Sequence, residues 1–433
     1  MNISPRYIPL LSAVVLLFST GPAVALDIYV DAQEGNDANP GTPEQPFRTI
    51  TAAVASIGDA TGISVRIAAG IYDATLGETF PMTVPSLAAL SGASATDTVI
   101  GGVPQSGARQ EQFVLGHKST LEDIGLDHVY IESKGRILMR RVHVDVGNVR
   151  TMGREDRLVD CVIANSPSSA IDGCVALERV HIINAEECGV GCTWGTSTMR
   201  DCLVENVQSI GIGGDSALIE DSRFVYRGEY PATFGVSSDN ARLVNCLFEG
   251  IGLQVKSLNC EVHRCVFTKG GARRGGLELR EIPESPTHKG TIKCIVTNSL
   301  FVDTEISFRY AAELRLINCT ITGNANPFFT QGLGLKAVNC VITGVNQRPG
   351  NVDYCLLDSP LAGKGNIVAD PMFVNPQNGD YHLQRGSPAI DSGTPVITVT
   401  DDFDGARRPQ GSGFDMGAYE FVADTGVSDW AVR

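Results

Sequence analysis

Aromatic and charged residues are both scarce in this chain of 433 residues. They make up 6% and 19% of it, whereas the chain contains 47 glycines and a hydrophobic share of 43%. That hydrophobic share and the lack of low-complexity segments exclude a disordered chain. Few aromatic residues with abundant glycine are instead typical of many short strands joined by turns.

Sharp catalytic motifs are also absent. The sequence contains no nucleophile elbow, HExxH pair, phosphate-binding loop or zinc-ligand spacing. Basic residues are outnumbered, because 34 Lys and Arg stand against 49 Asp and Glu, for a formal charge of −15. An acidic surface argues against nucleic acids and anionic membranes as partners. It also repels acidic polysaccharides unless basic residues gather locally.

Long hydrophobic runs are missing except at the N-terminus. There Arg6 precedes the apolar run Leu10–Phe18, and the small residues Ala23-Val24-Ala25 follow. This order predicts a cleaved signal peptide at residues 1–25, with an uncleaved anchor as the alternative. A membrane-spanning helix needs about 20 apolar residues, so we expect no membrane span. We expect the mature protein to be secreted or held in the cell envelope.

A repeat occupies the chain from about Ile124 to Leu357. One phrase returns as RLVDCVIAN, TMRDCLVEN, RLVNCLFEG and RLINCTITG, with a small or aliphatic residue at a fixed position that we call the landmark. The landmark residues are Ile124, Val142, Cys161, Val180, Cys202, Ser222, Cys246, Cys265, Ser299, Cys319, Cys340 and Cys355. A step of about 20 residues predicts stacked units, or rungs, that share one core.

The pattern around the landmark indicates the shape of each rung. Positions two after and three before it are uniformly apolar, although side chains alternate along a strand. A tight corner just before the landmark resolves this conflict. The residues at that corner are Asp160, Asp201, Asp221, Asn245, Asn298, Asn318 and Asn339. These types tolerate left-handed backbone, so we interpret them as structural. The sequence predicts an all-β fold, a right-handed parallel β-helix over residues 63–360.

The chain contains 12 cysteines, most of them at the landmark. An exported chain often pairs its cysteines, but in-register side chains of a parallel ladder point the same way and would strain to bond. We therefore favour a ladder of buried thiols over cross-rung disulfides. Cys188 and Cys192 lie off the landmark, where a local bridge is compatible with the sequence.

The position after the landmark should face outward, yet it is often apolar, as at Val162, Leu247 and Val341. An exposed apolar stripe is uncommon on a soluble monomer. We expect residues 361–433, where the repeat has ended, to form a C-terminal module that packs on this stripe. A second copy of the chain is the alternative cover.

The start of the chain predicts a strand and a short helix at residues 26–62, with the helix from about Phe47 to Ile57. Such an element would cap the open edge of the solenoid. The text YVDAQEGNDANPGTPEQPFRTITAAV, followed by IAAGIYD and GETFP, resembles the uncharacterised domain family that opens many exported parallel β-helix proteins. The resemblance covers about residues 28–103 and implies the fold. Similar openings occur in β-helical pectate and alginate lyases and in some glycoside hydrolases.

The C-terminal segment has a signature of its own. From Asp370 to Phe421 it resembles the choice-of-anchor module that follows β-helices on bacterial surface proteins. No hydrophobic sorting tail follows, which favours free secretion over anchoring. Within it, Asp402-Phe403-Asp404-Gly405 is compatible with a calcium loop and with an ordinary turn. Calcium is therefore the one cofactor left open, and no other metal is expected.

Chemistry on a β-helix is expected where outward side chains of successive rungs align. The segments LQVKS, LELRE and ISFRY place Lys256, Arg280 and Arg309 in one outward column. Gln254, Glu278 and Ser307 form a parallel column, and a long insertion nearby adds His288 and Lys289. Long loops are often functional. We take Lys256, Arg280, Arg309 and Glu278 as candidate catalytic residues, and Gln254, His288 and Lys289 as candidate substrate-binding residues.

These candidates suit a polysaccharide as the partner. Arg grips carboxylates at two points, and a basic side chain could remove a proton in β-elimination of a uronic acid. The leading hypothesis is binding or lyase-like cleavage of a polysaccharide, possibly an acidic one, with glycoside hydrolysis as a related activity. The rival hypothesis is a non-catalytic structural or adhesion protein of the cell surface or envelope. The alternative interpretation of the basic column is a solvated strand face with cross-rung charge pairs.

Overall fold

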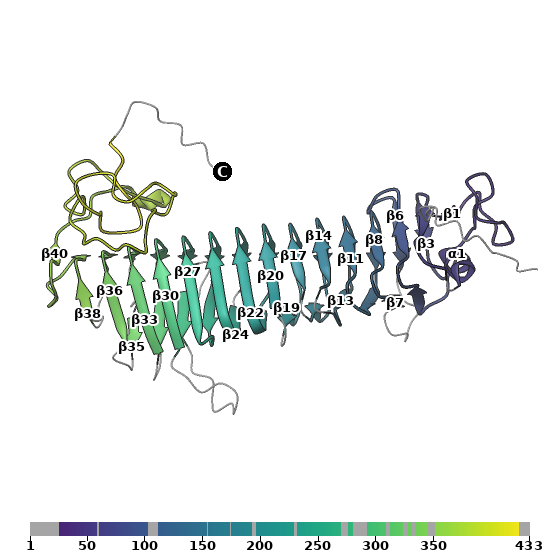
Figure 1. The fold of residues 1–433 in the computed structure, drawn as a ribbon, viewed down its shortest axis with the longest axis horizontal. Helices are drawn as coiled ribbons and strands as arrows, with labels where there is room; N and C mark the ends of the chain where they lie inside the picture. The colour runs from purple at the N-terminus through teal and green to yellow at the C-terminus, as the bar shows by residue number, and fades with distance from the viewer. Residues whose placement is uncertain are drawn as a thin grey trace, which may run out of the picture.

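The computed structural model describes residues 26–58, 60–102, 111–153, 155–173, 175–192, 196–228, 232–269, 276–279, 292–308, 312–323, 328–330, 334–344 and 351–423. It confirms the predicted parallel β-helix. Every strand pair of the solenoid is parallel, and short strands stack into a long rod (Figure 1). One end carries a short helix, and the C-terminal segment lies beside the other end.

The rungs build three faces, of which the lower and front faces belong to one sheet of 25 strands. The lower face, at the bottom of Figure 1, contains β4 (Met82–Val84), β7 (Glu111–Leu115), β10 (Val129–Ser133), β13 (Asn148–Arg150), β16 (Ser169–Asp172), β19 (Cys188–Cys192), the first halves of β22 (Ser209–Glu220) and β24 (Ala232–Val244), β26 (Ile251–Val255), β29 (Gly276–Leu279), β32 (Glu305–Phe308) and β35 (Phe328–Thr330). The front face contains β1 (Leu26–Val30), β2 (Ile63–Ile67), β5 (Ala89–Ser91), β8 (Thr120–Glu122), β11 (Leu138–Arg140), β14 (Arg157–Val159), β17 (Ala176–Glu178), β20 (Thr196–Arg200), the second halves of β22 and β24, β27 (Asn259–His263), β30 (Ile292–Thr297), β33 (Ala312–Ile317), β36 (Leu335–Val338) and β38 (Asn351–Asp353). Because β22 and β24 run through both faces, the chain bends there without a break in the strand.

The third face is a separate sheet of 15 strands. Its strands are β3 (Gly70–Tyr72), β6 (Thr98–Gly101), β9 (Gly125–Asp127), β12 (His143–Asp145), β15 (Val162–Ala164), β18 (His181–Ile183), β21 (Leu203–Glu205), β23 (Arg223–Val225), β25 (Leu247–Glu249), β28 (Val266–Thr268), β31 (Leu300–Val302), β34 (Thr320–Thr322), β37 (Val341–Ile342), β39 (Leu356–Leu357) and β40 (Ile367–Val368).

The corner between the front and third faces explains the repeated phrase. All seven predicted Asp and Asn corner residues have left-handed backbone, with φ between 47° and 55°. The landmark side chain then turns inward, and a Cys or Ser there donates a hydrogen bond to the carbonyl two residues earlier, at 3.3 Å from Cys161 Sγ to Val159 and 2.7 Å from Ser222 Oγ to Glu220. Cys and Ser are interchangeable at the landmark because both supply this donor from a small side chain.

Aromatic residues that are scarce overall concentrate in the core of the rod. Phe224, Phe248, Phe267 and Phe301 stack on successive rungs, with ring centroids 5.1, 4.9 and 4.7 Å apart. All four side chains are fully buried. Stacking at the rung spacing lets each ring contact the next without leaving a void, so this stretch of core holds neighbouring rungs in register.

The N-terminal helix α1 (Ile50–Ile57) begins later than expected because Thr49 is its N-cap, with extended backbone. Two carboxylates from other segments complete the cap. Glu78 accepts hydrogen bonds from the backbone N–H groups of Ile50 and Thr51 at 2.6 and 2.8 Å. Asp37 accepts them from the N–H groups of Arg48 and Thr49. Negative groups at a helix N-terminus satisfy its free donors and oppose its dipole.

The C-terminal segment from residue 361 contains the antiparallel hairpin of β41 (Phe373–Asn375) and β42 (Asp380–Leu383), joined through the 3₁₀ turn η1 (Pro376–Asn378). It packs on the third face. Leu383, Ala389 and Met416 bury Val341 and Leu356, and Tyr381, Ala418 and Tyr419 bury Leu300. Where no such cover lies, the outward Val162, Leu203 and Leu247 stay half-buried.

The cysteines at the landmark are buried free thiols, and Cys188 is also free. The local Cys188–Cys192 bridge is therefore wrong. Cys192 is disulfide-bonded, whereas Cys188 Sγ lies 3.2 Å from the carbonyl oxygen of Val190. The two cysteines are the first and last residues of β19, four positions apart, and a rise of about 3.3 Å per residue separates their Cα atoms by about 13 Å, too far for a bridge.

Candidate functional site

The outward side chains of the lower face align as predicted where β26, β29 and β32 pair. Gln254 lies opposite Glu278, and Glu278 lies opposite Ser307. The alternate residues Leu253, Leu277 and Ile306 are buried in the core. Because strand periodicity fixes which residues point outward, these three rungs hold their polar side chains at constant spacing.

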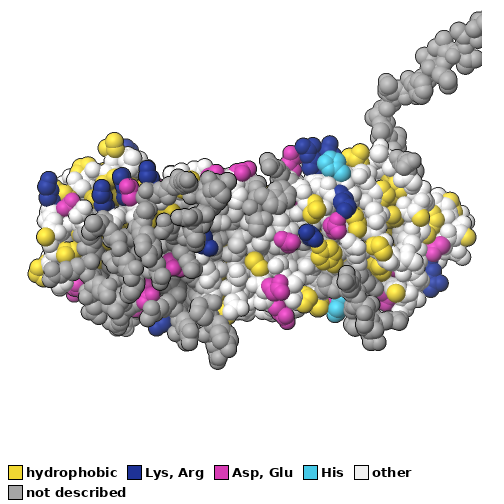
Figure 2. Space-filling model, turned by 90° about the horizontal axis from the view of Figure 1, so that it is seen from below, with side chains coloured by type: hydrophobic (Ala, Val, Ile, Leu, Met, Phe, Trp, Pro, Cys, Tyr) yellow, Lys and Arg dark blue, Asp and Glu magenta, His cyan; other side chains and the backbone are white. Residues whose placement is uncertain are grey.

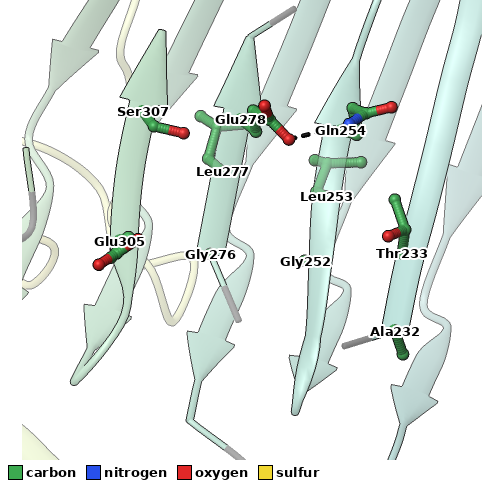
Figure 3. A pocket seen from close by; sticks show the side chains of 10 residues that line it. All are labelled: Ala232, Thr233, Gly252, Leu253, Gln254, Gly276, Leu277, Glu278, Glu305 and Ser307. Atoms are coloured by element: carbon green, nitrogen blue, oxygen red, sulfur yellow. Dashed lines mark hydrogen bonds between the residues drawn. The ribbon is translucent and has the colours of Figure 1, made fainter. Parts of the chain in front are cut away.

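A cavity of about 180 Å³ opens at this place. Gln254, Glu278, Glu305, Ser307 and Thr233 supply its polar walls, and Gly252 and Gly276 lie between them (Figure 3). Gln254 Nε2 donates to Glu278 Oε2 at 2.8 Å, drawn as the dashed line in Figure 3. The amide is only 9% exposed. This bond holds one oxygen of Glu278 and orients the carboxylate within the cavity.

The other candidate residues divide into two groups. Lys256 is half-buried beyond the end of β26, where its backbone N–H donates to the carbonyl of Val236, and it does not line the cavity. Arg280, Arg309, His288 and Lys289 lie outside the described residues. The structure therefore brings together Gln254 and Glu278 of the candidate set, and the basic column stays a prediction.

Glu305 and Thr233 also line the cavity but were missed from sequence. Glu305 stands two residues before Ser307 on β32 and so shares its outward face. The alternation of outward and inward side chains could have identified Glu305, but the strand was expected to begin one residue later, at Ile306. Thr233 belongs to β24, which continues from the lower face into the front face. Because the strand has no break at this bend, the sequence did not show which of its residues point outward on the lower face.

On the strands of the lower face that precede the cavity, glycines take the outward position that Gln254 holds in the cavity. Gly191, Gly211 and Gly235 stand in register with one another, and Gly235 is opposite Gln254. A Cβ added at Gly211 would meet nothing within 4 Å. In the view from below, uncharged white surface fills much of the described middle of the rod (Figure 2). At these three glycine positions the outer surface of the strands is backbone, next to the polar cavity.

The Asp402–Gly405 segment is built as a turn. The carboxylate of Asp402 accepts hydrogen bonds from the N–H groups of Ala406 and Glu420, at 2.7 and 2.9 Å. Asp404 contacts His382. Within the described part of the chain, no group of three or more His, Cys, Asp or Glu side chains is arranged to hold a metal ion. In that part, too, none of the helices is long and apolar enough to span a bilayer.

Residues 33–123 match a protein family of unknown function, DUF1565. The matched segment contains Asp37 and Glu78, the two carboxylates that cap α1. No curated protein matches the chain.

Solved structures with the same architecture include carbohydrate-active enzymes. The catalytic domain of a GH87 α-1,3-glucanase in complex with nigerose shares 10% identity at a TM-score of 0.50, covering 80% of this chain and 71% of that one. A pectate lyase shares 12% identity at 0.36, covering 92% and 97%. The mannuronan C-5 epimerase A-module of Azotobacter vinelandii shares 14% at 0.36, covering 79% and 100%. The likeness to the glucanase, at 10% identity, shows the fold alone. Residues 33–123 thus form a DUF1565 domain at the start of a parallel β-helix that resembles those of distant carbohydrate-active enzymes.

Proposed function

We propose that the lower face binds a polysaccharide, with the cavity around Gln254, Glu278 and Glu305 as the principal contact. The observation that carries this proposal is the set of amide, carboxylate and hydroxyl groups converging on one cavity from adjacent strands. Such groups recognise sugar hydroxyls, since each hydroxyl both donates and accepts. The similarity to the catalytic domain of an α-1,3-glucanase in complex with nigerose supports a carbohydrate as the ligand.

A neutral glycan fits the cavity better than an acidic one. Two of its polar walls are the carboxylates Glu278 and Glu305, which repel a uronic acid. Lys256 lies outside the lining, and the described lining residues include no Lys, Arg or His. We therefore favour a neutral polysaccharide over the acidic polymer expected from the basic column.

The two carboxylates also suit hydrolysis. Glu305 pairs with Gly276, two residues from Glu278, so the two side chains are diagonal neighbours on adjacent strands. A strand spacing of about 4.8 Å and a rise of about 3.3 Å per residue put their Cα atoms about 8 Å apart. Side chains that leave adjacent strands in parallel keep about the separation of their Cα atoms, and inverting glycoside hydrolases hold their carboxyl groups roughly 6.5–9.5 Å apart, with room for a water molecule. We propose Glu278 and Glu305 as the acid and base of such a reaction.

Binding and cleavage are tested separately. Purified protein is titrated with neutral glucans, polygalacturonate and alginate, and then incubated with each while new reducing ends and unsaturated ends are followed. We expect binding and reducing ends with a neutral glucan. Glu278→Gln and Glu305→Gln should retain binding and lose product. Glu261→Gln, an exposed carboxylate on the front face, is the matched control.

Each outcome decides one part of the proposal. Product with unsaturated ends from a uronic acid polymer would replace hydrolysis by elimination. Binding without product in the wild type would leave a non-catalytic carbohydrate-binding protein. Absence of binding to every glycan would contradict the proposal and favour a structural role in the envelope.

Export is proposed on separate grounds. The N-terminal 25 residues have the order of a signal peptide but lie outside the described residues. The disulfide at Cys192 supports folding in an oxidising compartment. N-terminal sequencing of the protein from its native culture should find a start at residue 26, and a start at Met1 in intact cells would contradict export.

A further inference from the structure

The C-terminal segment holds a histidine between two carboxylates. His382 of β42 places Nδ1 2.6 Å from Oδ1 of Asp380 on the same strand. Its Nε2 lies 2.7 Å from Oδ2 of Asp404, in the loop that follows residue 401. One imidazole ring therefore joins the β41–β42 hairpin to the 402–405 loop.

The geometry specifies the charge of the ring. An ionised carboxylate only accepts hydrogen bonds, and a neutral imidazole has a single N–H to donate. Both contacts are satisfied together only when both ring nitrogens carry a proton. Loss of that proton removes one hydrogen bond and leaves Asp380 and Asp404 repelling each other across an uncharged ring.

The surroundings hold the ring in place and set its charge balance. Tyr419 packs against it with ring centroids 4.0 Å apart, and Tyr419 in turn covers Leu300 of the β-helix. His382 also lines a cavity of about 760 Å³ with Arg385, Asp402 and Glu420. Arg385 disfavours the imidazolium, whereas the carboxylates favour it.

We propose that His382 is a proton-dependent clasp that fastens the β41–β42 hairpin to the 402–405 loop and so holds this part of the C-terminal segment closed on the β-helix. The clasp is closed under mildly acidic conditions. It opens locally as the ring deprotonates, which exposes the wall of the adjacent cavity.

The pKa of His382 is raised, which is the direction that a protonated clasp requires. Burial alone would lower the pKa of His382, but the hydrogen bonds and charges of Asp404 and Asp380 outweigh burial and raise it. A group with a raised folded pKa contributes stability that is complete below its unfolded pKa, about 6.5 for His, and is lost as pH rises through the folded value. The clasp therefore weakens toward alkaline pH.

Two measurements on the whole chain test the clasp. Nitrogen NMR of the labelled imidazole should find both ring N–H groups protected near pH 6.5 and a midpoint above about 6.5. Hydrogen exchange, corrected for the intrinsic pH effect, should show residues 373–383 and 402–406 opening about tenfold more at alkaline than at mildly acidic pH.

Variants separate the clasp from general folding effects. His382→Gln should remove the pH dependence of opening, because its amide does not titrate. His181→Gln is the control, since His181 contacts a single carboxylate, Glu205, on the third face. A His382 midpoint at or below 6.5, or the same pH dependence in His382→Gln and wild type, would overturn the proposal.

Discussion

Asn339 and Thr394 exchange two hydrogen bonds across the joint between the β-helix and the C-terminal segment. Asn339 Nδ2 donates to the carbonyl of Thr394, and the Thr394 N–H donates to Asn339 Oδ1, both at 2.8 Å. Asn318 Nδ2 and Asn298 Nδ2 donate in the same way to the carbonyls of Asp415 and Asp401, at 2.9 and 2.7 Å. The corner residues of three successive rungs thus bind the segment through their amides.

Asn318→Asp should weaken this joint. A carboxylate accepts hydrogen bonds only, so the buried carbonyl of Asp415 would face a second acceptor. We expect a loss of about 1–3 kcal/mol in the free energy of unfolding of the C-terminal segment, measured by denaturant titration or hydrogen exchange. Asn206→Asp changes an exposed left-handed residue elsewhere and should be nearly neutral. Equal losses in both variants would argue against the joint.

Arg408→Ala should destabilise the segment more. Arg408 and Glu420 form an ion pair with 0% exposure of either side chain, and Arg408 also donates to the carbonyls of Gly417 and Ala418. Removing one partner of such a pair costs about 3–5 kcal/mol, because the other charge stays buried. Arg385→Ala, at an exposed arginine, is the control for lost positive charge. Thermal unfolding of both variants separates burial from net charge.

Glu78→Gln should loosen the N-terminal cap. The carboxylate receives both helix N–H groups and the hydroxyl of Thr51, whereas an amide has one oxygen to accept with. We expect a loss of about 0.5–2 kcal/mol, read as faster hydrogen exchange at residues 50–57. The exposed Glu44→Gln is the comparison. Unchanged exchange in Glu78→Gln would mean that the cap does not hold the helix.

The pH dependence of the joint below neutrality should follow Asp415. Burial raises the pKa of Asp415 to about 6, against the hydrogen bonds from the N–H groups of Asp391 and Phe421. A carboxyl whose folded pKa is raised binds its proton more tightly when folded. Its contribution to stability is therefore complete below about pH 4 and is lost as pH rises to about 6. In Asp415→Asn the free energy of unfolding, measured against pH, should change less between about pH 4 and 6 than in the wild type. An unchanged pH dependence in the variant would mean that another group titrates in this range.

The features that recur in every rung could be predicted from the sequence. The landmark, the two apolar columns and the left-handed corners follow from residue types at fixed spacing, and the outward alignment of Gln254 with Glu278 follows from strand alternation. Contacts between distant segments were not predictable in this way. Glu78 reaches α1 from 28 residues away, and the amide of Asn298 reaches Asp401 from 103 residues away. The start of α1 was misplaced because Thr49 belongs to its cap, and Glu305 was missed because the start of its strand was misjudged.

The corner amides also set where along the rod the C-terminal segment packs. The rungs of a β-helix are nearly equivalent, so a segment that packs on apolar side chains alone could shift by one rung, about 4.8 Å, at little cost. Three earlier corners hold the carboxylates Asp160, Asp201 and Asp221, which cannot donate to a carbonyl, and the amide of Asn245 donates to Asp221 instead. Three amides in succession at Asn298, Asn318 and Asn339 therefore mark one position along the rod. At each of these corners an amide nitrogen replaces a carboxylate oxygen. The hydrogen-bond donor gained in this way fixes the position of the C-terminal segment along the rod.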